Sequence, residues 1–447
     1  MSRAARIRRP CGRAVCESAG VSRTVLVVGG GGREHALVRA ISRSPEAPRI
    51  HCVGGNAGIA RDAELVPLSI DDVGGVVALS TAFGADLVVV GPEAPLVAGV
   101  CDGLRAAGVR CFGPSGAAAR LEGSKAFAKE IMADAGVPTA RAHVVTTVDE
   151  GMAAVADLGL PAAVKADGLA AGKGVMVVGT EAEARAALET CLVDASFGDA
   201  GRTVVVEEGL TGPEVSLLAI TDGTSVARFP AARDYKPIGE GNTGPNTGGM
   251  GSVSPVPDIP DAEADALIDL IHRPVIAAMA RRGVPFQGVL YAGLMMTPDG
   301  PKVLEFNTRF GDPETQALLP RLDEDLLALL TAAADGALED RPVRVNDGAA
   351  VSVVLAAHGY PAAPRLGDVI TGLEEAAATG AEVFHAGTAP GEGGTIVTAG
   401  GRVLAVSARG DSVEDARAKA YAAADLIHFD GKQMRRDIAA AMSGTGG

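Results

Sequence analysis

Short apolar runs rich in valine alternate with longer mixed segments along the first 112 residues of the chain. A short apolar run bounded by glycine or proline is typical of a buried strand, and a longer mixed segment is typical of a helix. Strands alternating with helices predict a parallel, doubly wound sheet, and such sheets bind ligands beyond the carboxyl ends of their strands. The strands expected here are 24–29, 49–53, 86–90 and 109–112, and the helices are 34–43, 73–83 and 96–107.

The pattern farther along the chain predicts a compact unit at about 140–215, an irregular segment and a final unit at about 346–442. The irregular segment is 236–260, where six glycines and five prolines lead us to expect no regular structure. Ser124 is the expected N-cap of a helix. Further expected strands are 143–146, 162–166, 175–178, 203–208, 288–296, 302–307, 350–356, 382–388, 394–399 and 403–410, and further helices are 125–135, 150–158, 181–192, 262–282, 323–335 and 413–427.

Composition excludes several classes of protein. The length of 447 residues predicts roughly three domains, and a composition of 47% hydrophobic and 21% charged residues predicts a large core and argues against a disordered chain. No apolar run approaches the roughly 18 residues of a membrane span. The net charge of −15 repels a nucleic-acid backbone, and aromatic residues make up only 3%. The six cysteines form no Cys-x-x-Cys motif and suggest free thiols, so we expect a cytoplasmic protein with neither a nucleic-acid nor a membrane partner.

Residues 1–23 differ from the remainder of the chain. They carry six arginines and one glutamate, so this segment has a charge of +5 and the remainder has a charge of −20. A basic segment that is nearly free of acids resembles a transit peptide. We favour a disordered or non-native extension, with the functional chain beginning near Val21.

A run of four glycines, 29–32, separates the first expected strand from the first expected helix. A helix N-terminus after a strand is suited to hold a phosphate or a ribose, which makes Gly31 a candidate. Glu34 or His35 stands where a dinucleotide-binding fingerprint has its last glycine, so the segment is not that fingerprint. A tight turn with no ligand also explains the glycines.

Lys165 ends an apolar run and precedes a glycine-rich segment, 168–174. A P-loop has four residues between its first glycine and Gly-Lys, followed by Ser or Thr, whereas this segment has three residues and then Gly174. The segment is therefore not a P-loop, but a lysine beside a flexible turn is suited to hold phosphates. An exposed hairpin with solvated lysines is the alternative, and the segment alone favours neither.

Glu305, Asn307 and Arg309 alternate along an expected strand, so they share one face while Leu304 and Phe306 point into the core. A carboxylate and an amide oxygen suit Mg²⁺, which keeps phosphate oxygens and water as its other ligands. The guanidinium is suited to clamp a carboxylate or phosphoryl group. A surface face with a salt bridge is the alternative, and the polar turn that follows disfavours it.

The apolar run 204–206 leads into Glu207, Glu208 and Gly209. Such a strand end can offer backbone groups to an adenine and a carboxylate to a ribose, although an ordinary buried strand end is the simpler interpretation. The chain has no Gly-x-Ser-x-Gly motif and no His-Glu-x-x-His motif. Nucleophilic hydrolases and zinc enzymes therefore lack support.

Taken together, several segments resemble the ATP-grasp ligases, and among them the family that joins glycine to 5-phosphoribosylamine in purine biosynthesis. The resemblance extends over roughly residues 24–442, and 243–251 and 309–314 are long enough to be close to diagnostic. The segments that carry it are 54–58, 90–96, 121–125, 165–174, 243–251 and 309–314.

The resemblance implies an α/β chain with an N-terminal doubly wound parallel sheet, a central ATP-grasp core with a mobile lid, and a small C-terminal α+β domain. It also implies that ATP binds between the lid and the core. The implied bounds are 1–23 for the extension, 24–123 for the N-terminal substrate domain, 124–343 for the ATP-grasp domain with its lid at about 142–213, and 344–442 for the C-terminal domain.

The family's site residues carry over to individual positions of this chain. The implied cofactors are ATP and Mg²⁺ or Mn²⁺, and the implied substrates are glycine and 5-phosphoribosylamine. The positions are Lys125, Lys165 and Gly172 at the phosphates; Glu207, Gly209 and Leu210 at the adenine; Glu214 at the ribose; Glu305 and Asn307 at the metal; Arg309 and Asp234 as catalytic residues; and Gly31, Asn56, Glu93, Asn246, Thr247, Gly248 and Asp312 at the substrates.

The resemblance implies that ATP phosphorylates glycine and that the amine then displaces phosphate, which needs no protein nucleophile. Some relatives carry an acidic metal ligand on the preceding strand, but 289–296 has no acid, so phosphates and water are expected to complete the metal shell. We expect a monomer or a weak homo-oligomer. The alternatives are another ATP-grasp enzyme that uses bicarbonate or formate, a dinucleotide-dependent oxidoreductase, and a non-catalytic nucleotide-binding protein.

Overall fold

The computed structural model describes residues 23–169, 174–194 and 196–440. The expected extension lies almost wholly outside these ranges, and so does Gly172. Within the described residues, no helix is long and apolar enough to cross a bilayer.

The N-terminal part forms the parallel sheet that the alternation predicted, in the order β3-β2-β1-β4-β5. The expected helix 96–107 is wrong as one helix, because Gly99 adopts a left-handed conformation (φ 83°) that divides it into α3 and α4. The elements are β1 Thr24–Gly29, α1 Gly32–Ser42, β2 Arg49–Gly54, β3 Glu64–Val66, α2 Val73–Phe83, β4 Leu87–Val90, α3 Glu93–Val97, α4 Val100–Ala106, β5 Cys111–Phe112, α5 Gly116–Gly123 and α6 Lys125–Ala135.

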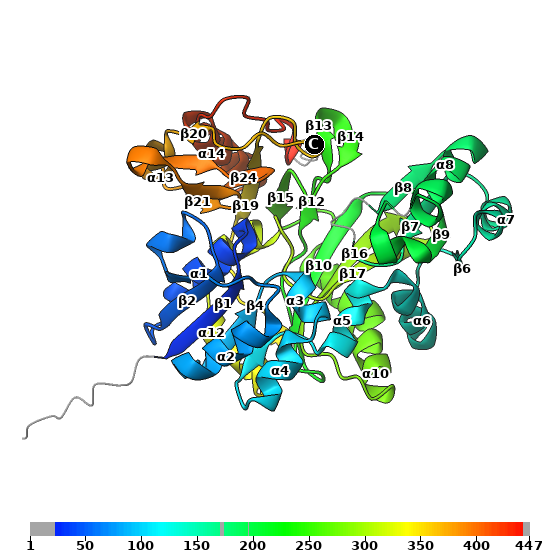
Figure 1. Ribbon diagram of the computed structural model, residues 1–447, viewed down its shortest axis with the longest axis horizontal. Helices are drawn as coiled ribbons and strands as arrows, with labels where there is room; N and C mark the ends of the chain where they lie inside the picture. The colour runs from blue at the N-terminus through cyan, green and yellow to red at the C-terminus, as the bar shows by residue number, and fades with distance from the viewer. Residues whose placement is uncertain (1–22, 170–173, 195, 441–447) are drawn as a thin grey trace, which may run out of the picture.

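The next unit is an antiparallel sheet in the order β6-β9-β7-β8, covered by two helices. Its buried side chains form a small cluster separate from the main core, and Figure 1 shows the unit projecting to one side of the molecule. We call this unit the lid. Its elements are β6 Ala142–Val145, α7 Val148–Leu158, β7 Ala162–Ala166, β8 Val175–Val178, α8 Glu181–Leu192 and β9 Val204–Glu208.

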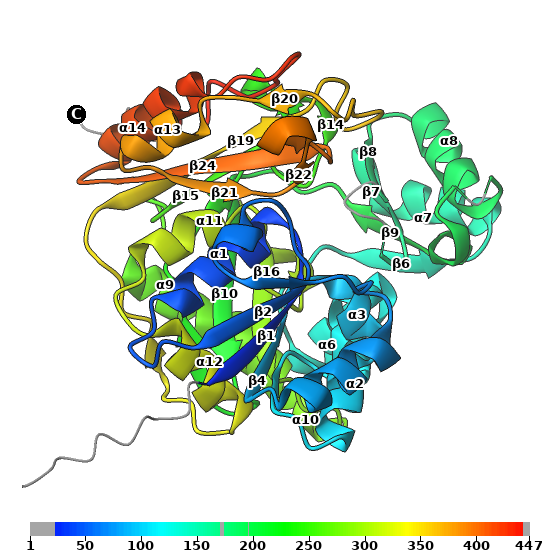
Figure 2. The ribbon, with the colours of Figure 1, turned by 60° about the vertical axis from the view of Figure 1, so that its left-hand side comes forward.

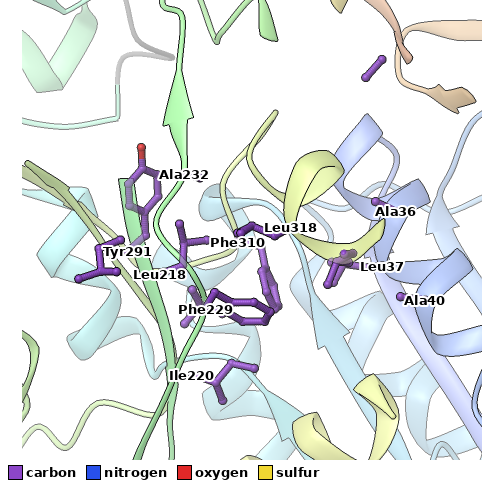
Figure 3. Packing of buried hydrophobic residues seen from close by; sticks show 14 of the residues in the cluster. Ala36, Leu37, Ala40, Leu218, Ile220, Phe229, Ala232, Tyr291, Phe310 and Leu318 are labelled. Atoms are coloured by element: carbon purple, nitrogen blue, oxygen red, sulfur yellow. The ribbon is translucent and has the colours of Figure 1, made fainter. Parts of the chain in front are cut away.

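The central sheet has the order β17-β16-β10-β11-β18. Its core is continuous with that of the N-terminal part: in Figure 3, Phe229, Phe310 and Leu318 lie beside Leu37 of α1. The elements of this region are β10 Glu214–Thr221, β11 Val226–Arg228, α9 Asp261–Leu267, a π-helical turn Ile268–His272, α10 Arg273–Arg281, β16 Gly288–Thr297, β17 Gly300–Asn307, α11 Thr315–Leu318, α12 Leu326–Ala334 and β18 Arg341–Pro342.

The expectation of no regular structure at 236–260 is wrong. A short hairpin, β13 with β14, lies there, and β15 pairs with β19 from far along the chain. Gly244 and Gly249 supply positive φ angles of 80° and 108°, which is why a glycine-rich segment can turn tightly between short strands. The elements are β12 Arg233–Asp234, β13 Pro237–Gly239, β14 Thr243–Asn246 and β15 Gly251–Ser254.

The C-terminal strands complete a third sheet, in the order β12-β15-β19-β24-β21, and a small sheet β20-β23-β22 lies beside it. The expected strand 382–388 is too long, because β21 ends at His385 and Thr388 begins β22. In Figure 2, α1 lies directly beneath β21. The elements are β19 Ala349–Ala356, β20 Val369–Ile370, α13 Leu373–Ala378, β21 Glu382–His385, β22 Thr388–Pro390, β23 Ile396–Thr398, β24 Arg402–Gly410 and α14 Val413–Leu426.

Candidate active site

A cavity of about 610 Å³ lies where the lid, the central sheet, α6 and the C-terminal part meet. Charged side chains from all of these regions line it. The lining residues used below are Glu93, Glu122, Lys125, Lys129, Lys165, Glu207, Asp234, Lys236, Glu305, Asn307, Arg309, Asp312 and Arg402.

At the lid end of the cavity, two lysines hold one buried carboxylate. Lys165 Nζ lies 2.7 Å from Glu207 Oε2, and Lys129 Nζ lies 2.9 Å from Glu207 Oε1. Glu207 is 3% exposed, and β7 and β9 are adjacent strands that place Lys165 beside it. Lys129 also donates to Thr139 Oγ1 and to the Ala140 carbonyl. It therefore contacts both segments that join the lid to the core: the one before β6 and the end of β9, which carries Glu207.

The helix α6 presents its N-terminus to the segment that follows β7. Ser124 caps the helix as predicted, since its hydroxyl accepts from the Phe127 N–H. Asp167 accepts from the Ser124 hydroxyl and from the Ala126 N–H, and Lys125 Nζ donates to the Gly168 carbonyl. Burial lowers the pKa of Lys125, although Glu305 opposes that shift. These contacts hold Lys125 and the N-terminus of α6 against the segment that follows β7.

The prediction that Leu304 enters the core is wrong. The pairing of β16 with β17 shifts register between Gly293 and Leu294, which face Glu305 and Val303, so Leu304 is the extra residue of a β-bulge. Leu304 is half-buried and lines the cavity, and its carbonyl accepts from Lys165 Nζ at 3.1 Å. The bulge therefore helps to aim Lys165 at the face that carries Glu305.

Glu305 and Asn307 lie on the cavity wall with Arg309, as their alternation predicted. Burial raises the pKa of Glu305, but Lys236, Lys165 and Lys125 outweigh burial and leave it below its usual value. This carboxylate therefore stays ionised. One carboxylate and one amide oxygen fit a cation such as Mg²⁺ that keeps phosphate oxygens and water. No group of three His, Cys, Asp or Glu residues suited to a metal gathers within the described ranges.

Arg309 is buried between two carboxylates. It lies 3.0 Å from Glu122 Oε1 and 3.4 Å from Glu93 Oε2, and it donates to Asn307 Oδ1 at 3.1 Å. Burial lowers the pKa of Arg309, but Glu122 and Glu93 outweigh burial and hold it above its usual value. The Arg309 Nε is buried and makes no hydrogen bond among the described residues. This nitrogen instead faces Glu93 Oε2 at 3.4 Å, an ion-pair contact beside the cavity.

On the opposite wall, β12 carries Asp234. Burial raises the pKa of Asp234 to about 7, against the lowering effect of Lys236. Lys236 Nζ lies 3.7 Å from Asp234 and 3.0 Å from Glu214. A carboxyl group that titrates near neutrality suits the binding of a small ammonium group.

A second cavity of about 450 Å³ adjoins the first, since Asp312 and Arg402 line both. Its walls are mainly backbone. Gly30, Gly31, Gly55 and Asn56 come from the N-terminal loops, and residues 386–388 come from the C-terminal part.

Comparisons with known proteins match nearly the whole chain to one enzyme family. Family models of phosphoribosylglycinamide synthetase match residues 23–122 (N domain), 123–315 (ATP-grasp domain) and 350–441 (C domain). The chain belongs to this family. A phosphoribosylamine–glycine ligase of Streptomyces coelicolor is 54% identical over 424 residues, which cover 94% of this chain and 99% of the relative.

Solved structures show the same fold. The crystal structure of phosphoribosylamine–glycine ligase from Thermotoga maritima has a TM-score of 0.82 and 35% identity, covering 93% of this chain and all of the other. The biotin carboxylase domain of 2-oxoglutarate carboxylase from Hydrogenobacter thermophilus, solved with MgADP and bicarbonate, has a TM-score of 0.71 at 17% identity, covering 92% of this chain and 91% of the other. At that identity the likeness shows the ATP-grasp fold alone. Of these two structures, the phosphoribosylamine–glycine ligase is the more similar to this chain.

Within this member of the synthetase family, most of the predicted site residues face one of the two cavities. Gly209, Leu210, Glu214 and Asn246 do not line either cavity. Gly209 instead donates to the Pro161 carbonyl and leaves no room for a Cβ beside it. The predicted residues in the first cavity are Glu93, Lys125, Lys165, Glu207, Asp234, Thr247, Gly248, Glu305, Asn307 and Arg309; Gly31 and Asn56 line the second, and Asp312 lines both.

Sequence reasoning missed several cavity residues. Lys129 follows Lys125 by one helical turn, a spacing that places both on one face of α6 and could have identified it. Glu122 lies in segment 121–125, which carries the resemblance, but it was given no role there, and Arg402 carries no local signal; each reaches Arg309 or Asp312 from far along the chain.

Proposed function

We propose that this chain joins glycine to 5-phosphoribosylamine at the expense of ATP and gives glycinamide ribonucleotide, ADP and phosphate. Family membership over nearly the whole chain supports the proposal. The observation that carries it is the first cavity, where lysines, the ionised Glu305 beside the Asn307 amide, and the Arg309 guanidinium face one space.

In this proposal ATP lies between the lid and the central sheet, with its phosphates beside Lys125 and Lys165. Glu207 faces the adenine. Glu305 and Asn307 would hold Mg²⁺ or Mn²⁺, which supplies positive charge at the phosphate oxygens when bound. The lysines move from Glu207 and from backbone carbonyls to the phosphates, so their present contacts hold them ready.

The reaction has two steps. A glycine carboxylate oxygen attacks the γ-phosphorus, the bond to the β–γ bridging oxygen breaks, and ADP leaves with that oxygen. The amine of phosphoribosylamine then attacks the carbonyl carbon of glycyl phosphate, phosphate leaves, and the nitrogen loses a proton as the amide forms. Arg309 orients the glycine carboxylate, and Asp234 in its ionised form binds the glycine ammonium.

The second cavity is assigned to the phosphoribosyl group. The N-terminus of α1 lies at this cavity, and the positive end of the helix dipole favours a phosphate or hydroxyl oxygen there. Arg402 and Asp312 line both cavities, so the amine of a bound phosphoribosylamine would face the glycine site. The lid excludes water, because an acyl phosphate hydrolyses readily.

An assay of ADP release with a panel of substrates tests the function. We expect release that requires both glycine and phosphoribosylamine, the latter generated in the assay from ribose 5-phosphate and ammonia. Equal release with bicarbonate or formate in place of glycine would favour another ATP-grasp reaction. Tight NADH binding would favour the oxidoreductase, and absence of ATP turnover would favour a non-catalytic binding protein.

A further inference from the structure

His35 lies wholly buried in the first turns of α1, between the N-terminal sheet and β21 of the C-terminal part. Its Nδ1 accepts a hydrogen bond of 2.8 Å from the backbone N–H of His385. A nitrogen that accepts from an amide carries no hydrogen, so the hydrogen of the neutral ring is on Nε2. That Nε2 lies 3.1 Å from Asp62 Oδ2, which accepts the hydrogen.

The surroundings of His35 keep the ring in this form. Burial lowers its pKa, Asp62 raises it and Arg39 lowers it, and the net pKa lies below the usual value. A second proton on Nδ1 would point at the His385 N–H and break that contact. The charged groups that face the ring are Asp62 and Arg39, with Glu382 farther away on β21.

The His385 backbone is also held from the second cavity. Asn56 Nδ2 donates to the His385 carbonyl at 2.7 Å and to the Gly30 carbonyl at 2.9 Å. The imidazole of His385 lies 3.0 Å from the hydroxyl of Thr388, and Thr388 lines the cavity. The two backbone groups of His385 therefore connect α1 and the Asn56 loop to the turn that forms the facing wall.

The residues around these hydrogen bonds are closely packed. A Cβ on Gly58 would lie 2.5 Å from Cε1 of the His35 ring. The His35 and His385 rings lie 5.6 Å apart, and the edge of His35 meets the ring of Phe384 at 5.8 Å. A small change at His35 thus moves the turn relative to the glycine loops.

We propose that His35 is a positioning residue for the phosphoribosyl site: as the Nε2–H tautomer, it holds the His385 amide and so fixes the 386–388 turn across the second cavity from Gly30 and Asn56. The inference rests on the proposed function, because it takes the second cavity as the place of the phosphoribosyl group. His35 itself does not line that cavity, so its effect acts through the turn.

Three substitutions of His35 separate its two hydrogen bonds. Asparagine places an oxygen near the position of Nδ1 and can still accept from His385, whereas glutamine reaches toward the position of Nε2 and keeps only the Asp62 side. Leucine keeps neither. His51 is a matched control, since it is another buried histidine of the N-terminal part, on β2, packs against Phe83 and lies outside both cavities.

The measurements are the affinity for glycinamide ribonucleotide by calorimetry and the separate KM values for ATP and glycine. We expect His35→Leu and His35→Gln to weaken nucleotide-product binding roughly tenfold, His35→Asn to stay within about threefold of wild type, and the KM for ATP to change less than about twofold in all. His51→Leu is expected to leave product affinity unchanged at a comparable loss of Tm.

Two results would overturn the inference: equal product affinity in the asparagine and glutamine variants, or a His51→Leu variant that weakens binding as much as His35→Leu. Failure of the proposed function looks different. Wild-type protein would then release no glycine-dependent ADP. If wild type is active but Asn56→Ala leaves product affinity unchanged, the second cavity is not the phosphoribosyl site and the role of His35 falls with it, while the ligase activity stands.

Discussion

The two cavities meet at Asp312 and Arg402, but they are built from different materials. The first is walled by charged side chains that arise from strands and helices and pair with one another. The second is walled mostly by glycine and alanine residues of loops, with Asn56, Asp312, Thr388 and Arg402 as its polar side chains. The first cavity is suited to phosphoryl transfer, and the second is suited to bind a sugar phosphate by shape complementarity.

Because of this difference, we expect substitutions at the two cavities to impair function in different ways. A charged side chain can be removed without moving the backbone, so loss of function at the first cavity is expected without loss of fold. A loop glycine holds its position because there is no room for a Cβ, so a change at the second cavity moves the wall itself. The predictions below test that difference.

The largest effect is expected for Glu305→Ala. The charges of Lys236, Lys165, Lys125 and Arg309 keep the pKa of this carboxylate low, and it is one of two oxygen donors for the proposed cation. We expect kcat to fall by about a thousandfold or more while far-UV circular dichroism and Tm stay close to wild type.

Glu305→Asp is the matched control, since it keeps the charge and shortens the side chain. We expect it to recover part of the activity and to respond to higher Mg²⁺ or Mn²⁺ concentration, whereas Glu305→Ala does not. Turnover like that of wild type in Glu305→Ala would remove the cation assignment. It would leave the second cavity untouched.

The same contrast explains which features of the fold and of the site the sequence could predict. Local patterns were sufficient where a side chain and its position on a strand carry the chemistry, as with Lys165, Glu305 and Asn307. The parallel sheet followed from valine-rich runs ending in glycine. The structure places these residues as expected, but the roles given to them are still predictions.

Sequence patterns were insufficient where a distant partner decides the outcome. The buried strand β10 was not predicted at all, although its Leu217 and Ile220 are fully buried; it pairs with β11, which follows it after a short turn, and with β16 from far along the chain. The bulge at Leu304 shifts an alternation that looked regular. Contacts across domains, such as His35 with His385, leave no local pattern.

At the second cavity, Gly30→Ala is expected to lower kcat/KM for phosphoribosylamine by roughly a hundredfold, because the loops must separate to admit the methyl group. The added Cβ would lie 2.5 Å from the Gly55 carbonyl oxygen. The KM for ATP is expected to stay within about twofold. Gly74→Ala is the control: the nearest atom to its Cβ is 3.8 Å away, on the exposed side of α2. A Gly30→Ala variant with unaltered phosphoribosylamine kinetics would contradict the comparison.

A smaller effect is expected from pH at the glycine end of the first cavity. Burial raises the pKa of Asp234 to about 7, so the carboxylate that binds an ammonium forms as pH rises through neutrality. From pH 6 to pH 8 the KM for glycine should fall roughly tenfold, and Asp234→Asn should abolish that dependence. The folded chain also holds this proton more tightly than the unfolded chain, so its contribution to stability is full below pH 3.8 and is lost as pH rises through about 7. A glycine KM independent of pH in wild type would remove Asp234 from the site.

The smallest effect is expected at the outer edge of the lid. Lys302 Nζ lies 3.0 Å from Glu208 Oε1, and Arg141 Nε lies 3.0 Å from Glu208 Oε2, where the lid joins the central sheet. Arg141 is exposed and still pairs with Glu208 when the partly buried Lys302 is replaced, so Lys302→Met should cost about 1 kcal/mol and change the KM for ATP less than about threefold. The Arg141 N–H, and then Lys302, lower the pKa of Glu208 to about 2 from 4.5. The contribution of the pair to stability is therefore complete above pH 4.5 and is lost as pH falls toward 2, so the difference in stability between wild type and Lys302→Met should shrink over that range in acid denaturation. A large rise in the KM for ATP would instead mean that the Lys302–Glu208 pair, and not the buried Lys129–Glu207–Lys165 contact, holds the lid in place.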